Sequence, residues 1–133
     1  MGIDVNAKDN NGGTPLSWAA SWGSSLIVKA LLDHGARIVL NAKDNEGKTP
    51  LSWAAIRGSS QVVKTLLKHG IGIDVNAKDN EGRTPLSWAA SKGIPIVVKE
   101  LLEHVGMRMQ RTTEVGHRCR GLRLGTTRTR RQW

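Results

Sequence analysis

Apolar residues with a helical period mark the segment that ends at Gly35. They lie at positions i, i+1, i+4 and i+5 and are Ile27, Val28, Leu31 and Leu32. This spacing places all four on one face of a helix, and a glycine such as Gly35 is a common residue at a helix end. A shorter apolar segment, residues 16–22, precedes this stripe and stops at Gly23. We therefore predict two consecutive helices with a turn between them.

The start of the shorter helix carries two local signals. The hydroxyl oxygen of Thr14 can accept a hydrogen bond from the first helical turn, and Pro15 suits the first helical position, where no backbone N–H bond is lost. The polar residues after the second helix, such as residues 70–76, are rich in turn-forming types and predict an extended loop or a hairpin. One unit is thus a loop followed by a helix–turn–helix.

This unit is repeated. The string TPLSWAA occurs at residues 14–20, 49–55 and 84–90, with the same spacing of 35 residues each time. We divide the chain into a first repeat (about 9–43), a second repeat (44–78) and a third repeat (79–105), followed by residues 106–133. A helix pair cannot bury its apolar face alone, so neighbouring pairs must stack against one another.

The repeat explains the unusual aromatic content. The chain has five tryptophans but no Phe and no Tyr. Three of the five, Trp18, Trp53 and Trp88, are one repeat position counted three times. The small residues Ala19 and Ala20 beside the first of them allow helices to approach closely, and we expect the tryptophans to supply the bulk of the core.

The repeated residues resemble the ankyrin repeat. The pattern here is D-N-x-G-x-T-P-L-S-W-A-A-x-x-G, four variable residues, then V-K-x-L-L-x-H-G, and the match covers roughly residues 2–104. The T-P-L-S-W-A-A variant looks like the long ankyrin arrays of fungal proteins. The usual His after T-P-L is replaced by Ser17, Ser52 and Ser87, so that family histidine's hydrogen bond is not expected. The resemblance implies an all-α solenoid of about three helix–turn–helix repeats with hairpin or loop connections.

The same resemblance implies that the chain binds another protein and is not an enzyme. Partners of ankyrin arrays usually contact the hairpin tips and the inner face of the first helices, which together form the concave face. The matching positions are Asn11, Gly13, Ser21 and Trp22, then Glu46, Lys48, Ile56 and Arg57, then Glu81, Arg83, Ser91 and Lys92. Trp and Arg are frequent at binding hot spots, but variation at exposed positions is equally compatible with neutral drift.

The two ends of the array differ from a capped solenoid. Residues 2–10 are identical to residues 72–80, so the sequence begins within a linker, and no polar capping repeat comes first. Because terminal caps normally keep such arrays soluble, we expect an exposed apolar flank on the first helix pair and possible self-association through uncapped ends. We also expect the chain to be a fragment of a longer array, in which case it need have no function of its own.

Residues 106–133 break the pattern. They contain eight Arg, no Lys and one acidic residue, so they carry +7 of the total charge of +9, whereas residues 1–105 carry only +2. We expect a disordered basic tail. The codons permitted for residues 106–125, read in the frame that starts at each third base, can spell a further copy of the repeat, so the tail is compatible with a fourth repeat translated out of frame. The alternative function is nucleic-acid association through this arginine-rich segment.

Other candidate chemistry has little support. His34, His69 and His104 recur at the end of the second helix, where a helix terminus favours cationic residues, and no ligand partner accompanies them. Gly47-Lys48-Thr49 imitates a phosphate-binding loop but lacks the required upstream glycine, because Ala42 stands there. The single cysteine, Cys119, excludes a disulfide framework within the chain. We therefore expect no catalytic, cofactor or metal site, no membrane span, and a protein partner inside the cell, in the cytoplasm or the nucleus.

Overall fold

The computed structural model describes residues 3–34 and 37–104. The described residues up to Leu101 belong to one compact unit, and residues 102–104 belong to a second unit, of which nothing further is described. The predictions for the tail, namely disorder, an out-of-frame fourth repeat, the free Cys119 and nucleic-acid binding, all fall on residues 106–133 and lie outside the described residues.

Each repeat contributes a pair of helices. They are α1 (Pro15–Trp22), α2 (Ser25–Asp33), α3 (Pro50–Arg57), α4 (Ser60–His69) and α5 (Pro85–Lys92), followed by a helix at residues 95–104. No residue of the described ranges is in a β-strand. The predicted all-α fold with helix–turn–helix repeats is therefore confirmed. None of the helices in the described part is long and apolar enough to cross a membrane.

The first helix of each repeat starts and stops where its local residues predict. The Thr14 hydroxyl accepts a hydrogen bond from the backbone N–H of Ser17 at 3.2 Å, while the Ser17 hydroxyl accepts one from the backbone N–H of Thr14 at 2.8 Å. This reciprocal capping box satisfies two backbone donors at once. The serine that replaces the family histidine is thus a helix-capping residue. At the other end, Gly23 has a positive φ of 75°, which ends α1.

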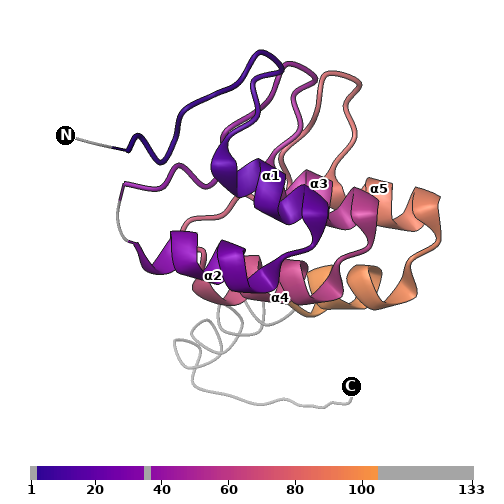
Figure 1. Ribbon diagram of the computed structural model, residues 1–133. Coiled ribbons are helices and arrows are strands. Elements are labelled where there is room, and N and C mark those ends of the chain that lie inside the picture. The colour runs from indigo at the N-terminus through magenta and orange to yellow at the C-terminus, as the bar shows by residue number, and fades with distance from the viewer. Residues whose placement is uncertain (1–2, 35–36, 105–133) are drawn as a thin grey trace, which may run out of the picture. The chain divides into compact units, whose positions relative to one another are not determined.

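The helices form two rows (Figure 1). The first helices α1, α3 and α5 lie side by side in one row, the second helices α2 and α4 form the other, and the loops project beyond the first row. Backbone hydrogen bonds close each loop tip, for example from the Asp9 N–H to the Gly13 carbonyl at 3.0 Å. The tips are therefore hairpin turns, as predicted, although no strand ladder continues below them.

Asparagine side chains tie neighbouring loops together. The Asn45 side-chain amide donates to the carbonyl of Asn10 at 3.0 Å, and its backbone N–H donates to the carbonyl of Asn11 at 2.9 Å. Asn80 makes the equivalent pair of bonds to the second repeat. Polar loops that would otherwise rely on water are thus held in register, and the row of tips becomes a defined surface.

The apolar core runs between the two rows and from repeat to repeat. It is continuous and includes Leu16, Ala20, Val28, Leu51, Ala55, Val62, Val63, Leu66, Ala89, Val97 and Leu101. The paired alanines of α1 and α3, and Ala89 of α5, are almost completely buried, which agrees with close helix approach, whereas Ala90 at the end of the described array is exposed. The predicted exposed apolar flank of the first repeat is also present, because Leu26 and Ile27 are 81% and 55% exposed.

The repeated tryptophans are less buried than the sequence predicted. Trp18 is 48% exposed, whereas the equivalent Trp53 and Trp88 are partly buried and pack against the core. Helix geometry explains the error. Leu16 and Ala20 are four residues apart and face the core, whereas Trp18 lies two residues from both and therefore points to the other side of α1. The tryptophans line the concave face instead.

Candidate functional site

The concave face carries a regular row of tryptophan–aspartate pairs. In each repeat the indole Nε1–H donates to the carboxylate nine residues earlier. The distances are 2.6 Å for Trp18 to Asp9, 2.9 Å for Trp53 to Asp44 and 2.9 Å for Trp88 to Asp79. An indole N–H without a partner costs free energy when it leaves water, so this bond lets a large ring lie half-buried. The hairpin tip thereby fixes the orientation of the ring.

The same carboxylates organise the hairpin turns. The Asp9 Oδ1 atom accepts the backbone N–H groups of Asn11 and Gly13, both at 2.9 Å. The Gly13 N–H, followed by the Trp18 indole, holds the pKa of Asp9 below its ordinary value of 3.8, although partial desolvation opposes the shift. This carboxylate is therefore ionised at neutral pH.

Asp79 in the third repeat behaves in the same way. Burial raises the pKa of this carboxyl group and is the largest single influence on it. The N–H of Arg83, the indole of Trp88 and the N–H of Glu81 together outweigh that effect, so the pKa lies below 3.8. A buried charge is thus retained because it accepts several hydrogen bonds.

Cationic side chains lie over two of the three tryptophans. The Lys48 ammonium is 5.0 Å from the ring centre of Trp53 and 5.4 Å from that of Trp88, so it lies between the second and third repeats. Arg83 and Lys92 also approach Trp88, at 4.6 Å and 6.0 Å, and Arg57 approaches Trp53 at 5.9 Å. These distances are within the range of cation–π attraction.

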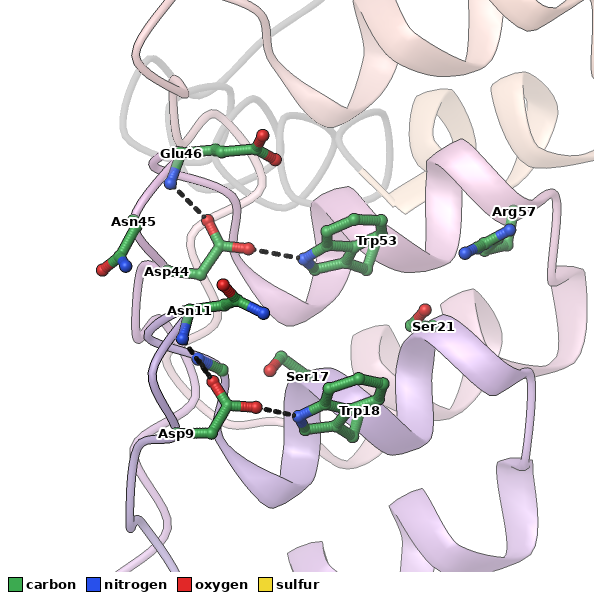
Figure 2. Close-up of a pocket in the computed structure, with 11 residues that line it drawn as sticks. Asp9, Asn11, Ser17, Trp18, Ser21, Asp44, Asn45, Glu46, Trp53 and Arg57 are labelled. Atoms are coloured by element: carbon green, nitrogen blue, oxygen red, sulfur yellow. Dashed lines mark hydrogen bonds between the residues drawn. The ribbon is translucent and has the colours of Figure 1, made fainter.

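A cavity of about 500 Å³, the first cavity, lies between the first and second repeats. Figure 2 shows the two indoles that face it, in the same orientation on α1 and α3, with the carboxylates of Asp9 and Asp44 at their nitrogen ends. The lining residues are Asp9, Asn11, Gly13, Ser17, Trp18, Ser21, Asp44, Asn45, Glu46, Trp53 and Arg57. Two aromatic walls and several convergent polar groups are typical of a binding site.

A smaller cavity of about 170 Å³, the second cavity, lies between the next two hairpin tips. Its lining residues are Asn45, Glu46, Lys48, Asp79, Asn80 and Glu81. The Lys48 ammonium makes an ion pair with Glu46 at 2.6 Å, and only 16% of the lysine side chain is exposed. The Lys48 side chain thus lies in the space between the second and third repeats, whereas the equivalent space between the first two repeats stays open.

The structure brings together part of the predicted partner surface. Asn11, Gly13, Ser21, Glu46 and Arg57 line the first cavity, and Glu46, Lys48 and Glu81 line the second. The other five predicted residues, Trp22, Ile56, Arg83, Ser91 and Lys92, line neither cavity. Trp22, Arg57 and Lys92 end α1, α3 and α5, as the predicted column requires, and Trp22 is 78% exposed.

Sequence reasoning missed the tryptophan and aspartate pairs of this surface. A signal was present, because each repeat has an aspartate nine residues before its tryptophan. The helical period gave a second signal, since Trp18 is out of phase with the core stripe of Leu16 and Ala20.

The histidines and the residues that imitate a phosphate-binding loop lie at helix ends and in a hairpin turn. His34 follows α2 as its cap and His69 ends α4. Gly47 lies in a hairpin turn with φ 81°, and Thr49 caps α3. Among the described residues, no group of three or more His, Cys, Asp and Glu side chains could hold a metal ion.

Comparison with known families agrees with this architecture. A family model described as ankyrin repeats (3 copies) matches residues 1–79 and again residues 38–113. No curated relative matches the chain. Ankyrin repeats generally bind other proteins and are typically not enzymes. Because the two matches together span most of the 133 residues, the chain belongs to the ankyrin-repeat family.

Proposed function

We propose that this chain recognises another protein through its concave face and catalyses no reaction itself. The observation that supports this proposal most is the row of partly exposed tryptophans, with the first cavity open between two of them. Exposed indole rings held in one orientation are available to a partner without a further loss of side-chain freedom. Such pre-organisation reduces the entropic cost of binding.

The residues around the row differ between repeats in a way that suits recognition. The residue before the capping threonine is Gly13, Lys48 or Arg83, and the last residue of the first helix is Trp22, Arg57 or Lys92. Trp and Arg are enriched among residues that dominate binding energies. The constant residues therefore build the frame, while the variable ones provide selectivity.

Differential capture tests this proposal. Immobilised wild-type chain is compared with Arg57→Glu on the concave face and with Lys68→Glu on α4, where the lysine side chain is exposed. A partner that binds the concave face is retained by the wild type and by Lys68→Glu but loses at least tenfold in affinity for Arg57→Glu. The purified partner is then titrated against all three chains.

Circular dichroism melts of the same three chains serve as the folding control. Both substitutions are at exposed positions, so all three should unfold at similar temperatures. The proposal is wrong if partners bind Arg57→Glu as tightly as the wild type while Lys68→Glu abolishes their binding.

A further inference from the structure

The two inter-repeat spaces of the concave face lie between equivalent tryptophans, but within the described residues a lysine ammonium lies between the two indoles in only one of them. Between Trp53 and Trp88, the Lys48 ammonium lies within 5.4 Å of both ring centres and 2.6 Å from a carboxylate oxygen of Glu46. Because the lysine side chain is only 16% exposed, the two rings and the carboxylate replace much of the water around its charge.

The first cavity has equivalent aromatic walls, and its lining cation is the Arg57 guanidinium, 5.9 Å from the ring centre of Trp53. The position of Lys48 is taken by Gly13 in the first repeat, and Trp18 and Trp53 both line the open space of about 500 Å³. Within residues 3–34 and 37–104, no lysine or arginine is placed over the ring of Trp18. The replacement of lysine by Gly13 is thus the difference between the space between Trp53 and Trp88, which contains an ammonium group, and the open space between Trp18 and Trp53.

The charges around the first cavity favour a cation. Two carboxylates that form no ion pair with any described residue, those of Asp9 and Asp44, line it together with one guanidinium, that of Arg57. The third lining carboxylate, that of Glu46, already pairs with Lys48 at 2.6 Å. Figure 2 places Arg57 at the opposite end of the indoles from the aspartates. Carboxylates repel an anion and attract an ammonium group. The end of the cavity beside the hairpin tips, where the aspartates lie, therefore favours a positively charged ligand.

The geometry points to a lysine side chain of the protein partner as the occupant of this space. We propose that its ammonium group lies between the indoles of Trp18 and Trp53, as the ammonium of Lys48 lies between those of Trp53 and Trp88. This inference rests on the proposed function, because it names the chemistry by which the concave face would recognise its partner.

A titration followed by nuclear magnetic resonance tests the inference. The ¹⁵N-labelled full chain receives a blocked pentapeptide with one lysine between glycines, and the indole Nε1–H signals are assigned by single Trp→Phe substitutions. The signals of Trp18 and Trp53 should shift saturably, while that of Trp88 stays within error. A matched peptide with norleucine, which lacks the ammonium group, should bind at least tenfold more weakly.

Two substitutions test the role of the ammonium group: one adds it to the first cavity, and the other removes it from the space between Trp53 and Trp88. Gly13→Lys supplies a tethered ammonium and should lower the affinity for the lysine peptide at least tenfold. Gln61→Lys on α4 is its control: it adds the same ammonium group at an exposed position that lines neither cavity, and should retain binding within about twofold. Conversely, Lys48→Gly should make the Trp88 signal respond to the peptide. Repeats with Lys48 and Arg83 show that the fold accepts a side chain at this position.

Other outcomes overturn the inference. Equal shifts with the norleucine peptide would mean that the cavity selects apolar chains, and a response to an arginine peptide alone would mean that it selects guanidinium groups. The absence of any shift in the Trp18 and Trp53 signals would also reject it. The proposed function is decided separately by partner capture with Arg57→Glu, so the two can fail independently.

Discussion

The second repeat and its two neighbours have nearly the same sequence but different surroundings. Leu51 of the second repeat is 1% exposed and Leu16 of the first is 2% exposed, whereas the equivalent Leu86 of the third is 37% exposed. The position of Ile27 shows the opposite trend: it is 55% exposed in the first repeat, while Val62 in the second is completely buried. Each repeat therefore has one face towards the preceding repeat and another towards the following one.

This difference shows that the exposure of a side chain in the array depends on whether a neighbouring repeat covers it and not on the residue type. The leucine of T-P-L packs against the following repeat, and the first valine position of the second helix packs against the preceding one. Only the second repeat has both faces covered within the described residues. In such an array, stability is approximately the sum of repeat and interface contributions, so equivalent substitutions should have unequal effects.

The largest expected effect comes from the leucine of T-P-L. Leu51→Ala should lower the free energy of unfolding by about 2–5 kcal/mol, because it leaves a cavity in a fully packed interface. Leu86→Ala removes the same atoms from a side chain that is 37% exposed and should cost about 1 kcal/mol. Urea denaturation measures both. Equal losses would show that the two faces are equally packed in solution.

Alanine substitutions at two equivalent glycines distinguish the cost of backbone strain from the cost of a clash between neighbouring repeats. Gly47 and Gly82 occupy the same turn with φ near 80°, so alanine at either position should cost about 1–2 kcal/mol in strain. A Cβ atom at Gly47 would also lie 2.5 Å from the Asn80 Oδ1 atom, whereas one at Gly82 meets no atom within 4 Å. Gly47→Ala should therefore lose about 1–3 kcal/mol more than Gly82→Ala.

Urea midpoints of the two glycine variants provide this measurement. The difference between them isolates the contact between neighbouring hairpin tips, because the strain is common to both. A Gly82→Ala variant that is the less stable of the two would contradict the observed contact.

Acid should weaken the hairpin tips. The pKa values of Asp9 and Asp79 are lower in the folded chain than the ordinary 3.8, so the unfolded chain binds protons more tightly. Their stabilising effect is thus complete well above pH 3.8 and is lost as the pH falls through the folded-state values. Urea midpoints measured from pH 7 down to pH 3 should decrease. Asp79→Asn should flatten this dependence, and an unchanged slope would exclude Asp79 as a source.

The smallest effect is expected at an exposed ion pair on the first repeat. Lys29 and Asp33 lie 2.9 Å apart on α2, with about half of each side chain exposed. Their coupling in a double-mutant cycle should be at most about 0.5 kcal/mol and should decrease in high salt. A coupling above about 1 kcal/mol would indicate that this outer helix is less solvated than its exposure suggests.

Local signals predicted the helices well. Thr14, Pro15 and Gly23 mark the ends of α1, and the same three types mark α3 and α5. These effects depend on hydrogen bonds and torsion angles within a few residues, so one sequence is enough to identify them. Five of the residues that the family resemblance predicted as partner contacts line the first cavity.

The tryptophans mark the limit of that approach. Their bulk suggested burial, but their orientation depends on a hydrogen bond to an aspartate nine residues away across a hairpin. The open space beside Trp18 was equally inaccessible to sequence reasoning, because it arises from Gly13 in one repeat and the stacking of the next repeat against it.

The sequence by itself determined the repeat, the capped helices and the alternation of helix pairs with hairpin tips, since all of these follow from contacts between near neighbours in the chain. Only the tertiary structure decided which equivalent leucine is covered and which indole lacks a cation. Those properties depend on what packs against each repeat, and identical segments acquire different surfaces when their neighbours differ.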